Sequence, residues 1–298
     1  ADLKSFDSTG KLVLLPITVN TRGIYPSLQL TKRLSEGKQL QLSYSRRVNR
    51  PTPRELNPFL DVSDPVNYDA GNPRLLPESI HSVELTFTHT QPKASLTAGA
   101  YFTQVNNVIK HIQTPPVNDV TYTVSQNLKR AINTGIELIG NFHPLKAWDF
   151  SVNANLYERI NDADSAFGIS ATHGFSWNAN ITSNFTIVKN LTLQVRADYK
   201  AGDVILQDRY RHVYGIDGGI RYDCWHGKAS LALNGRDIFN LRRPSFFRVS
   251  DALLLDWQRI TYSARTSLTF TYRFGKSTGG AGNRKKIDTQ QDTRIENR

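Results

Sequence analysis

The chain has 298 residues, of which 39% are hydrophobic and 21% are charged, and its formal net charge is +11 at pH 7. No apolar run approaches the roughly 18–20 residues of a membrane-spanning helix, so a helical membrane protein is excluded. The basic residues are spread along the chain and form no basic helix, so we expect no nucleic-acid partner.

The first 22 residues have no clear assignment. Residues 11–19 are apolar and β-prone, but Pro16 argues against a central strand, so we expect a loop or a partial strand. From residue 23 onward, apolar and polar residues alternate as they do along strands with one apolar and one polar face. The alternation predicts eleven strands, near residues 25–31, 40–47, 80–90, 95–112, 127–142, 148–157, 175–182, 191–200, 214–223, 229–236 and 260–274. In the fourth, the phase slips around Val105–Val108, which predicts a β-bulge.

The last predicted strand, Ile260–Phe274, shows the pattern most fully. Its even positions are mostly apolar and end in aromatic residues, whereas its odd positions are polar and include Arg265 and Arg273. Its length exceeds the usual strand of about 5–6 residues. It suits a strand tilted across a bilayer, with one face toward lipid and the other toward a wet lumen.

The connections between the predicted strands alternate between short and long. Short ones fall at 35–37, 91–94, 143–146, 189–190 and 225–228, and long ones at 49–78, 113–120, 161–171, 202–210 and 244–255. This alternation is typical of bacterial outer-membrane barrels, with short periplasmic turns and long extracellular loops, and it disfavours a soluble propeller or sandwich. We therefore predict an all-β, antiparallel, up-and-down transmembrane barrel segment over residues 23–275, followed by a disordered polar periplasmic tail at 276–298.

Two sets of residues are candidates for function. Charged residues on the polar face would hold a plug or line a ligand path, unless they only form a hydrated wall with cross-strand ion pairs. These are Arg47, Glu84, Glu137, Arg196, Asp217, Arg221, Arg236 and Arg265. In the long 49–78 loop, Phe59, Tyr68, Asp69 and Asn72 are candidates for ligand capture. No histidine spacing indicates a metal site and no Ser/His/Asp set stands out, so we expect no metal, cofactor or enzymatic activity.

Several stretches resemble TonB-dependent outer-membrane receptors of the Bacteroidetes type. Together they span about residues 25–276, nearly all of the patterned chain. The matching stretches are Leu42–Pro51, Glu55–Phe59, Asn67–Tyr68, Gly71–Glu78, Ala131–Glu137, Asp237–Asn240 and Thr271–Lys276. Their order and spacing along the chain make the resemblance specific.

The resemblance implies a barrel of about 22 strands with a plugged lumen, and import energised by a periplasmic TonB complex. The sequence shows neither a plug nor a TonB-binding segment, and it contains no methionine. We therefore interpret it as the C-terminal half of such a barrel, whose partners would be membrane lipid, a plug domain, the other barrel half and the TonB complex. The ligand would be a siderophore, cobalamin, glycan or peptide. The alternative is a small self-closing barrel, completed by a strand at 11–19, that acts as a porin, secretion translocator or hydrolase.

Overall fold

The structure is a computed structural model, and it describes residues 2–6, 12–16, 23–113, 118–164, 170–205, 208–250, 253–260 and 262–274. The predicted tail at 276–298 lies outside these residues. In the described part of the chain, no helix is long and apolar enough to cross a membrane.

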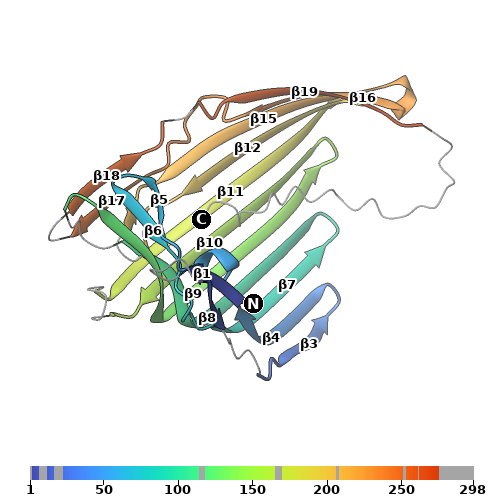
Figure 1. The fold of residues 1–298 in the computed structure, drawn as a ribbon. Helices are drawn as coiled ribbons and strands as arrows, with labels where there is room; N and C mark the ends of the chain where they lie inside the picture. The colour runs from blue at the N-terminus through green and yellow to red at the C-terminus, as the bar shows by residue number, and fades with distance from the viewer. Residues whose placement is uncertain are drawn as a thin grey trace.

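One large sheet, antiparallel in all but one of its strand pairs, dominates the fold (Figure 1). It has thirteen strands, and with β5 and β6 set aside, eleven follow one another in chain order from β3 to β19. This confirms the predicted number and order of the barrel strands. Their bounds are β3 (Ser27–Ser35), β4 (Lys38–Asn49), β7 (Glu78–Gln91), β8 (Ala94–Gln113), β9 (Thr121–Leu145), β10 (Trp148–Asn161), β11 (Thr172–Val188), β12 (Leu191–Lys200), β15 (Val213–Cys224), β16 (Ala229–Arg236) and β19 (Arg265–Tyr272).

The register carries one apolar and one polar face across the whole sheet. Leu42 lies opposite Leu85 on the apolar face, and Ser43 lies opposite Glu84 on the polar face. Large apolar side chains on the first face remain exposed, as Ile136 does at 53%. An apolar surface of this extent is typical of a membrane-facing barrel wall, so this face meets lipid and the polar face lines the lumen.

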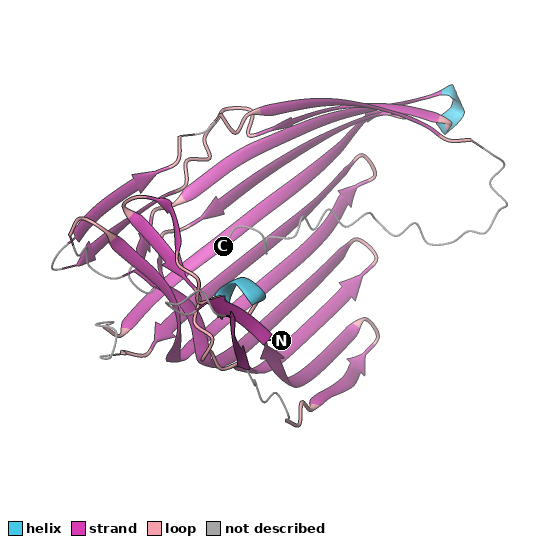
Figure 2. Ribbon diagram, viewed as in Figure 1, coloured by secondary structure: helices cyan, strands magenta, loops and turns pink. Residues whose placement is uncertain are grey.

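The strands begin and end at two opposite edges of the sheet, and these two edges differ in their connections, as predicted. On one edge, short turns join β3 to β4, β7 to β8, β9 to β10 and β11 to β12, and a short 3₁₀ helix, η2 (Trp225–Gly227), joins β15 to β16. On the opposite edge the long loops carry further structure, which the alternating pattern did not predict. Figure 2 shows its helix and strands: α1 (Pro53–Leu56), β5 (Asp61–Asp64), β6 (Asn67–Ala70), β13 (Asp203–Ile205), β14 (Asp208–Tyr210), β17 (Ser245–Ser250) and β18 (Leu253–Gln258).

The hairpin of β8 and β9 projects beyond its neighbour on the loop-bearing edge. β7 follows β8 only as far as Asn106, whereas β8 and β9 remain paired out to Gln113. The projecting part holds a small core of Val108, Ile112 and Leu128. β6 adds to β9 in parallel, which ties the 49–78 loop to this hairpin.

Two local predictions were wrong. The predicted last strand, 260–274, is shortened to β19. Within the described part of the chain its one neighbour is β16, which ends at Arg236, before Asp237 takes a left-handed φ of 47°. No bulge occurs at 105–108, because the register to β9 is the same on both sides of Asn107; that residue instead has a φ of 57°. Residues 12–16, expected to be a loop or a partial strand, form the short strand β2. It pairs with β1 (Asp2–Phe6) and adds no twelfth strand to the large sheet, which the alternative small barrel would require.

Candidate functional site

The register places all eight predicted lumen residues on the polar face. It brings two pairs of them together, because Arg196 lies opposite Asp217 and Arg236 lies opposite Arg265. The remaining four are distributed over β4, β7, β9 and β15: Arg47, Glu84, Glu137 and Arg221. Their common face agrees with the sequence pattern, while their role toward a plug or a ligand stays a prediction.

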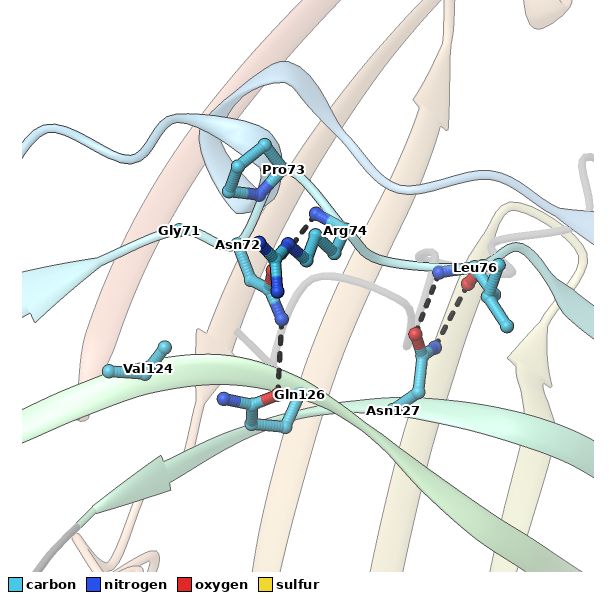
Figure 3. Close-up of a pocket in the computed structure, with 8 residues that line it drawn as sticks. All are labelled: Gly71, Asn72, Pro73, Arg74, Leu76, Val124, Gln126 and Asn127. Atoms are coloured by element: carbon cyan, nitrogen blue, oxygen red, sulfur yellow. Dashed lines mark hydrogen bonds between the residues drawn. The ribbon is translucent and has the colours of Figure 1, made fainter. Parts of the chain in front are cut away.

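An open hollow of about 570 Å³ lies where the 49–78 loop meets the projecting β8–β9 hairpin (Figure 3). Figure 3 shows the loop on one side and β9 on the other, joined by hydrogen bonds. The Asn72 amide donates to Oε1 of Gln126 at 3.0 Å, and Asn127 accepts from the Leu76 backbone at 2.7 Å and donates back to its carbonyl at 2.9 Å. Amide and backbone groups therefore build the hollow, which is lined by Gly71, Asn72, Pro73, Arg74, Leu76, Val124, Gln126 and Asn127.

Among the four predicted capture residues, Asn72 is the one that lines this hollow. Phe59 is exposed elsewhere on the loop, at 48%. Tyr68 packs edge-to-face on Tyr122 with ring centroids 5.5 Å apart, and Asp69 lies opposite Thr123 in the β6–β9 pairing. The sequence pattern did not indicate Gln126 and Asn127, because their approach to the loop depends on a contact across more than fifty residues of chain.

A helix cap fixes the near side of the hollow. Thr52 caps α1, and Glu55 reciprocates by accepting from the Thr52 backbone amide at 2.7 Å. The backbone of residues 71 and 72 then bonds to that helix, with Gly71 donating to the Asn57 carbonyl at 2.7 Å. A β-carbon on Gly71 would lie 2.5–2.6 Å from backbone oxygens of Arg54, Glu55 and Asn57.

We expect Gly71→Ala to release the loop from α1. Three backbone oxygens cannot move aside as a flexible side chain would, so overpacking should cost the local structure about 1–3 kcal/mol. Hydrogen exchange of residues 53–76 should accelerate, while the barrel strands keep their protection. Gly99→Ala is the matched control, since its new β-carbon meets nothing closer than 3.6 Å. Equal protection in both variants would contradict the expectation.

Acidic pH should loosen the hairpin of β5 and β6. The Ser63 hydroxyl and backbone amide lower the pKa of Asp61, and the Val66 amide and Asn67 side chain lower the pKa of Asp64. A pKa that is lower in the folded hairpin means that these bonds stabilise it above the ordinary Asp value of about 3.9. That contribution is lost as the pH falls through the folded values. Amide exchange of residues 61–70 should therefore lose protection below about pH 4; loss already between pH 7 and 5 would refute this cause.

Arg242 fastens the loop after β16 to the lumen wall. Its guanidinium donates to both oxygens of Asp217, at 2.7 and 3.1 Å, and also pairs with Asp198 on the next strand. It lies against Gly215, where a β-carbon would come within 2.4 Å of its Nε atom. We call Arg242, Asp198 and Asp217 the Arg242 clamp. Arg242 was not predicted, because the sequence of a loop does not indicate that one of its residues pairs with Asp198, 44 residues away.

Asp237 stabilises the turn that brings Arg242 to the barrel wall. It is fully buried, and its carboxylate accepts from the backbone amides of Leu241 at 2.8 Å and Arg242 at 3.1 Å, and from the Ser263 hydroxyl. Asp237 and Asn240 both have positive φ, which these residue types tolerate better than most. The Asp237–Asn240 stretch therefore has a structural role, because its residues stabilise this turn.

The loop sheet of β13, β14, β17 and β18 is fastened at two further points. Asp203 accepts from the Tyr157 hydroxyl at 2.8 Å and from Arg159 at 3.0 Å, and its side chain is only 2% exposed. Arg248 joins Asp208 at 2.6 Å and also reaches Gln113 at the end of β8. The long loops therefore form ordered structure at the loop-bearing edge, held to the lumen wall by charged groups. Among the described residues, no cluster of three or more His, Cys, Asp or Glu side chains is placed to hold a metal ion.

Comparison with solved structures supports an outer-membrane barrel fold. The ferric yersiniabactin uptake receptor FyuA from Yersinia pestis matches with a TM-score of 0.59 and 12% identity, over 84% of this chain and 37% of that one. The siderophore receptor PirA from Pseudomonas aeruginosa matches with a TM-score of 0.55 and 16% identity, over 73% and 36%. The copper transporter OprC gives 0.57 and 11%, over 78% and 38%. At these identities the likeness shows the fold alone, and the chain spans less than two fifths of each of these proteins.

The family assignment comes from the sequence. No curated protein matches the chain. A sequence model of the outer membrane protein beta-barrel family matches residues 16–272, which is most of the chain and includes every strand of the large sheet from β3 to β19. The predicted fold class and location are thus confirmed: the chain belongs to the outer membrane protein beta-barrel family and forms barrel wall in the outer membrane of a Gram-negative bacterium.

Proposed function

We propose that the chain is part of the wall of an outer-membrane receptor for TonB-dependent uptake of a nutrient solute. The observation that carries the proposal is the eleven-strand sheet, with its charged polar face and its long loops folded at one edge. The resemblance to TonB-dependent receptors, and the similarity in fold to proteins described as uptake receptors and a copper transporter, support the same function. A siderophore, cobalamin, a glycan or a peptide would suit such a receptor.

The proposal includes strands and a plug beyond those of the large sheet. Among the described residues, β3 and β19 each have one strand neighbour, so each leaves a row of backbone donors and acceptors unpaired. Such groups must be paired in a bilayer, which only a closed barrel achieves. A receptor barrel of about 22 strands would close these edges. Its plug would fill the lumen beside the charged wall, and its TonB complex would act from the periplasm.

The alternative is a small self-closing barrel that works as a porin, translocator or hydrolase. It would require β3 and β19 to approach each other, with residues 11–19 supplying a further strand. Residues 12–16 pair instead with 2–6, so no feature of the described sheet favours this alternative.

Two measurements test the proposal. An immunoblot of source outer membranes, with an antibody to the 49–78 loop, should show a band two to three times the 33.6 kDa of this chain. A heat-modifiable band near that mass would instead indicate the small barrel.

Cells lacking the gene are then compared with the parent for uptake of labelled siderophore, cobalamin, oligosaccharide and peptide. We expect one uptake to be lost, and the parent to lose the same one when the proton gradient is collapsed; uptake that survives the collapse would refute energised import.

A further inference from the structure

Three arginines form a row on the lumen face near the loop-bearing edge. Arg236 and Arg265 lie directly opposite each other on β16 and β19, and both are exposed. Arg196 lies on the same face two strands away from β16, opposite Asp217. We call Arg196, Arg236 and Arg265 the arginine row. Among the described residues, no carboxylate forms an ion pair with any of the three.

The nearby carboxylates are already engaged. Asp217 receives both terminal nitrogens of Arg242 and the Asp237 backbone amide at 2.7 Å. Asp198 pairs with the same Arg242, and Asp237 is enclosed by backbone and hydroxyl donors. Asp198 and Asp217 carry two negative charges against the one positive charge of Arg242, so the Arg242 clamp offsets part of the charge of the arginine row, although neither acid forms an ion pair with it.

Two like charges directly opposite each other on a sheet repel, and in the described wall neither Arg236 nor Arg265 forms an ion pair with a carboxylate. Guanidinium groups present a planar fork of donors that matches the two oxygens of a carboxylate or phosphate. Facing positions on neighbouring strands put both forks within reach of one such group. Arg236 and Arg265 can therefore form charge-assisted hydrogen bonds with one acidic group, and no such group is paired with them in the described part of the chain.

We propose that the arginine row is an anion-binding site, and that it receives a carboxylate or phosphate group of the imported solute. The inference rests on the proposed function, and it narrows the ligand to an acidic solute. The row lies on the path of a solute that enters from the loop side and passes along the wall. An acidic side chain of the plug could supply the same chemistry, so the experiment must separate these two sources.

The test uses the intact outer-membrane protein, purified in detergent, with citrate as the probe. Calorimetry at fixed ionic strength measures citrate binding to the parent, to the double variant Arg236→Gln/Arg265→Gln and to Arg265→Glu. The last variant creates an Arg–Glu pair between β16 and β19, so it keeps the sheet while removing the anion site. The control Lys146→Gln/Lys189→Gln removes the same charge from exposed residues on the opposite, turn-bearing edge.

We expect the parent and the lysine control to bind citrate, and both arginine variants to bind it at least tenfold more weakly. If the parent does not bind citrate, the unfolding midpoint of the arginine double variant is compared with that of the lysine control. A lower midpoint in the arginine double variant than in the lysine control would identify a protein carboxylate as the anion and refute the solute as its source. An equal or higher midpoint would show a solvated like-charge pair and overturn the site altogether. Uptake that survives collapse of the proton gradient would refute the proposed function and leave these binding results unchanged.

Discussion

Replacing Gly215 with valine is expected to detach the loop after β16 from the barrel wall. The valine β-carbon would occupy the space of the Arg242 guanidinium, within 2.4 Å of Nε and 2.5 Å of Cζ. Displacing Arg242 leaves Asp198 and Asp217 without their counter-ion at a site where the three side chains are only 14–32% exposed. Breaking a partly buried pair in this way should cost about 2–3 kcal/mol.

The effect is measured as the urea midpoint of the detergent-solubilised protein, followed by tryptophan fluorescence. Gly218→Val is the matched control on the same strand, because its new β-carbon has no neighbour closer than 3.8 Å. Arg242→Gln should reproduce the loss, and combining it with Gly215→Val should add little, since both remove the same contact. Additive losses would mean that valine at 215 damages the strand itself and not the clamp.

Replacing Asp203 with alanine should free the hairpin of β13 and β14 from the wall. The change removes the acceptor of both Tyr157 and Arg159, and it leaves Arg159, which is 24% exposed, without its partner. Losing one member of a largely buried pair should cost about 3 kcal/mol, concentrated in this loop sheet. Protease cleavage within residues 202–212 should become much faster, while the barrel strands stay resistant.

Asp256→Ala provides the contrast within the same loop sheet. Asp256 binds Arg211 through two bonds of 2.9 Å, so its geometry is as good, but the side chains are 44% and 59% exposed. Solvent screens such a pair, and many exposed pairs contribute nothing measurable. We expect little change in cleavage. Equal acceleration in both variants would show that burial does not decide the strength of these contacts.

The barrel strands were predictable because a single local rule governs them. A period of two assigns each residue to a face, and lipid on one side with water on the other keeps that period along a strand such as β11. The rule fails where a strand loses its neighbour. The alternation of apolar and polar residues runs from Ile260 to Phe274, but pairing with β16 covers only Arg265–Tyr272. Periodicity describes a side-chain environment and not the extent of hydrogen bonding.

The loops were less predictable because distant contacts define them. Asn72 was identified from its loop chemistry, but its partner Gln126 lies on a strand more than fifty residues later. Tyr68 and Asp69 carry the residue types of a binding site, yet they are used in pairing β6 with β9. The arginines of the row were placed on the correct face, whereas the pairing of Asp198 and Asp217 with Arg242 was not predicted, because Arg242 lies in a loop.

The order of the strands has a consequence for how the wall assembles. Every neighbour in the large sheet, from β3 to β19, is also the next barrel strand along the chain, so each hairpin can form on the edge left by the one before. Such local pairing involves small loop-closure entropies and favours fast stepwise growth. The slow events should be the distant ones: docking of β6 on β9, the Arg248 contact that spans 135 residues, and the final meeting of the two free edges with their partners.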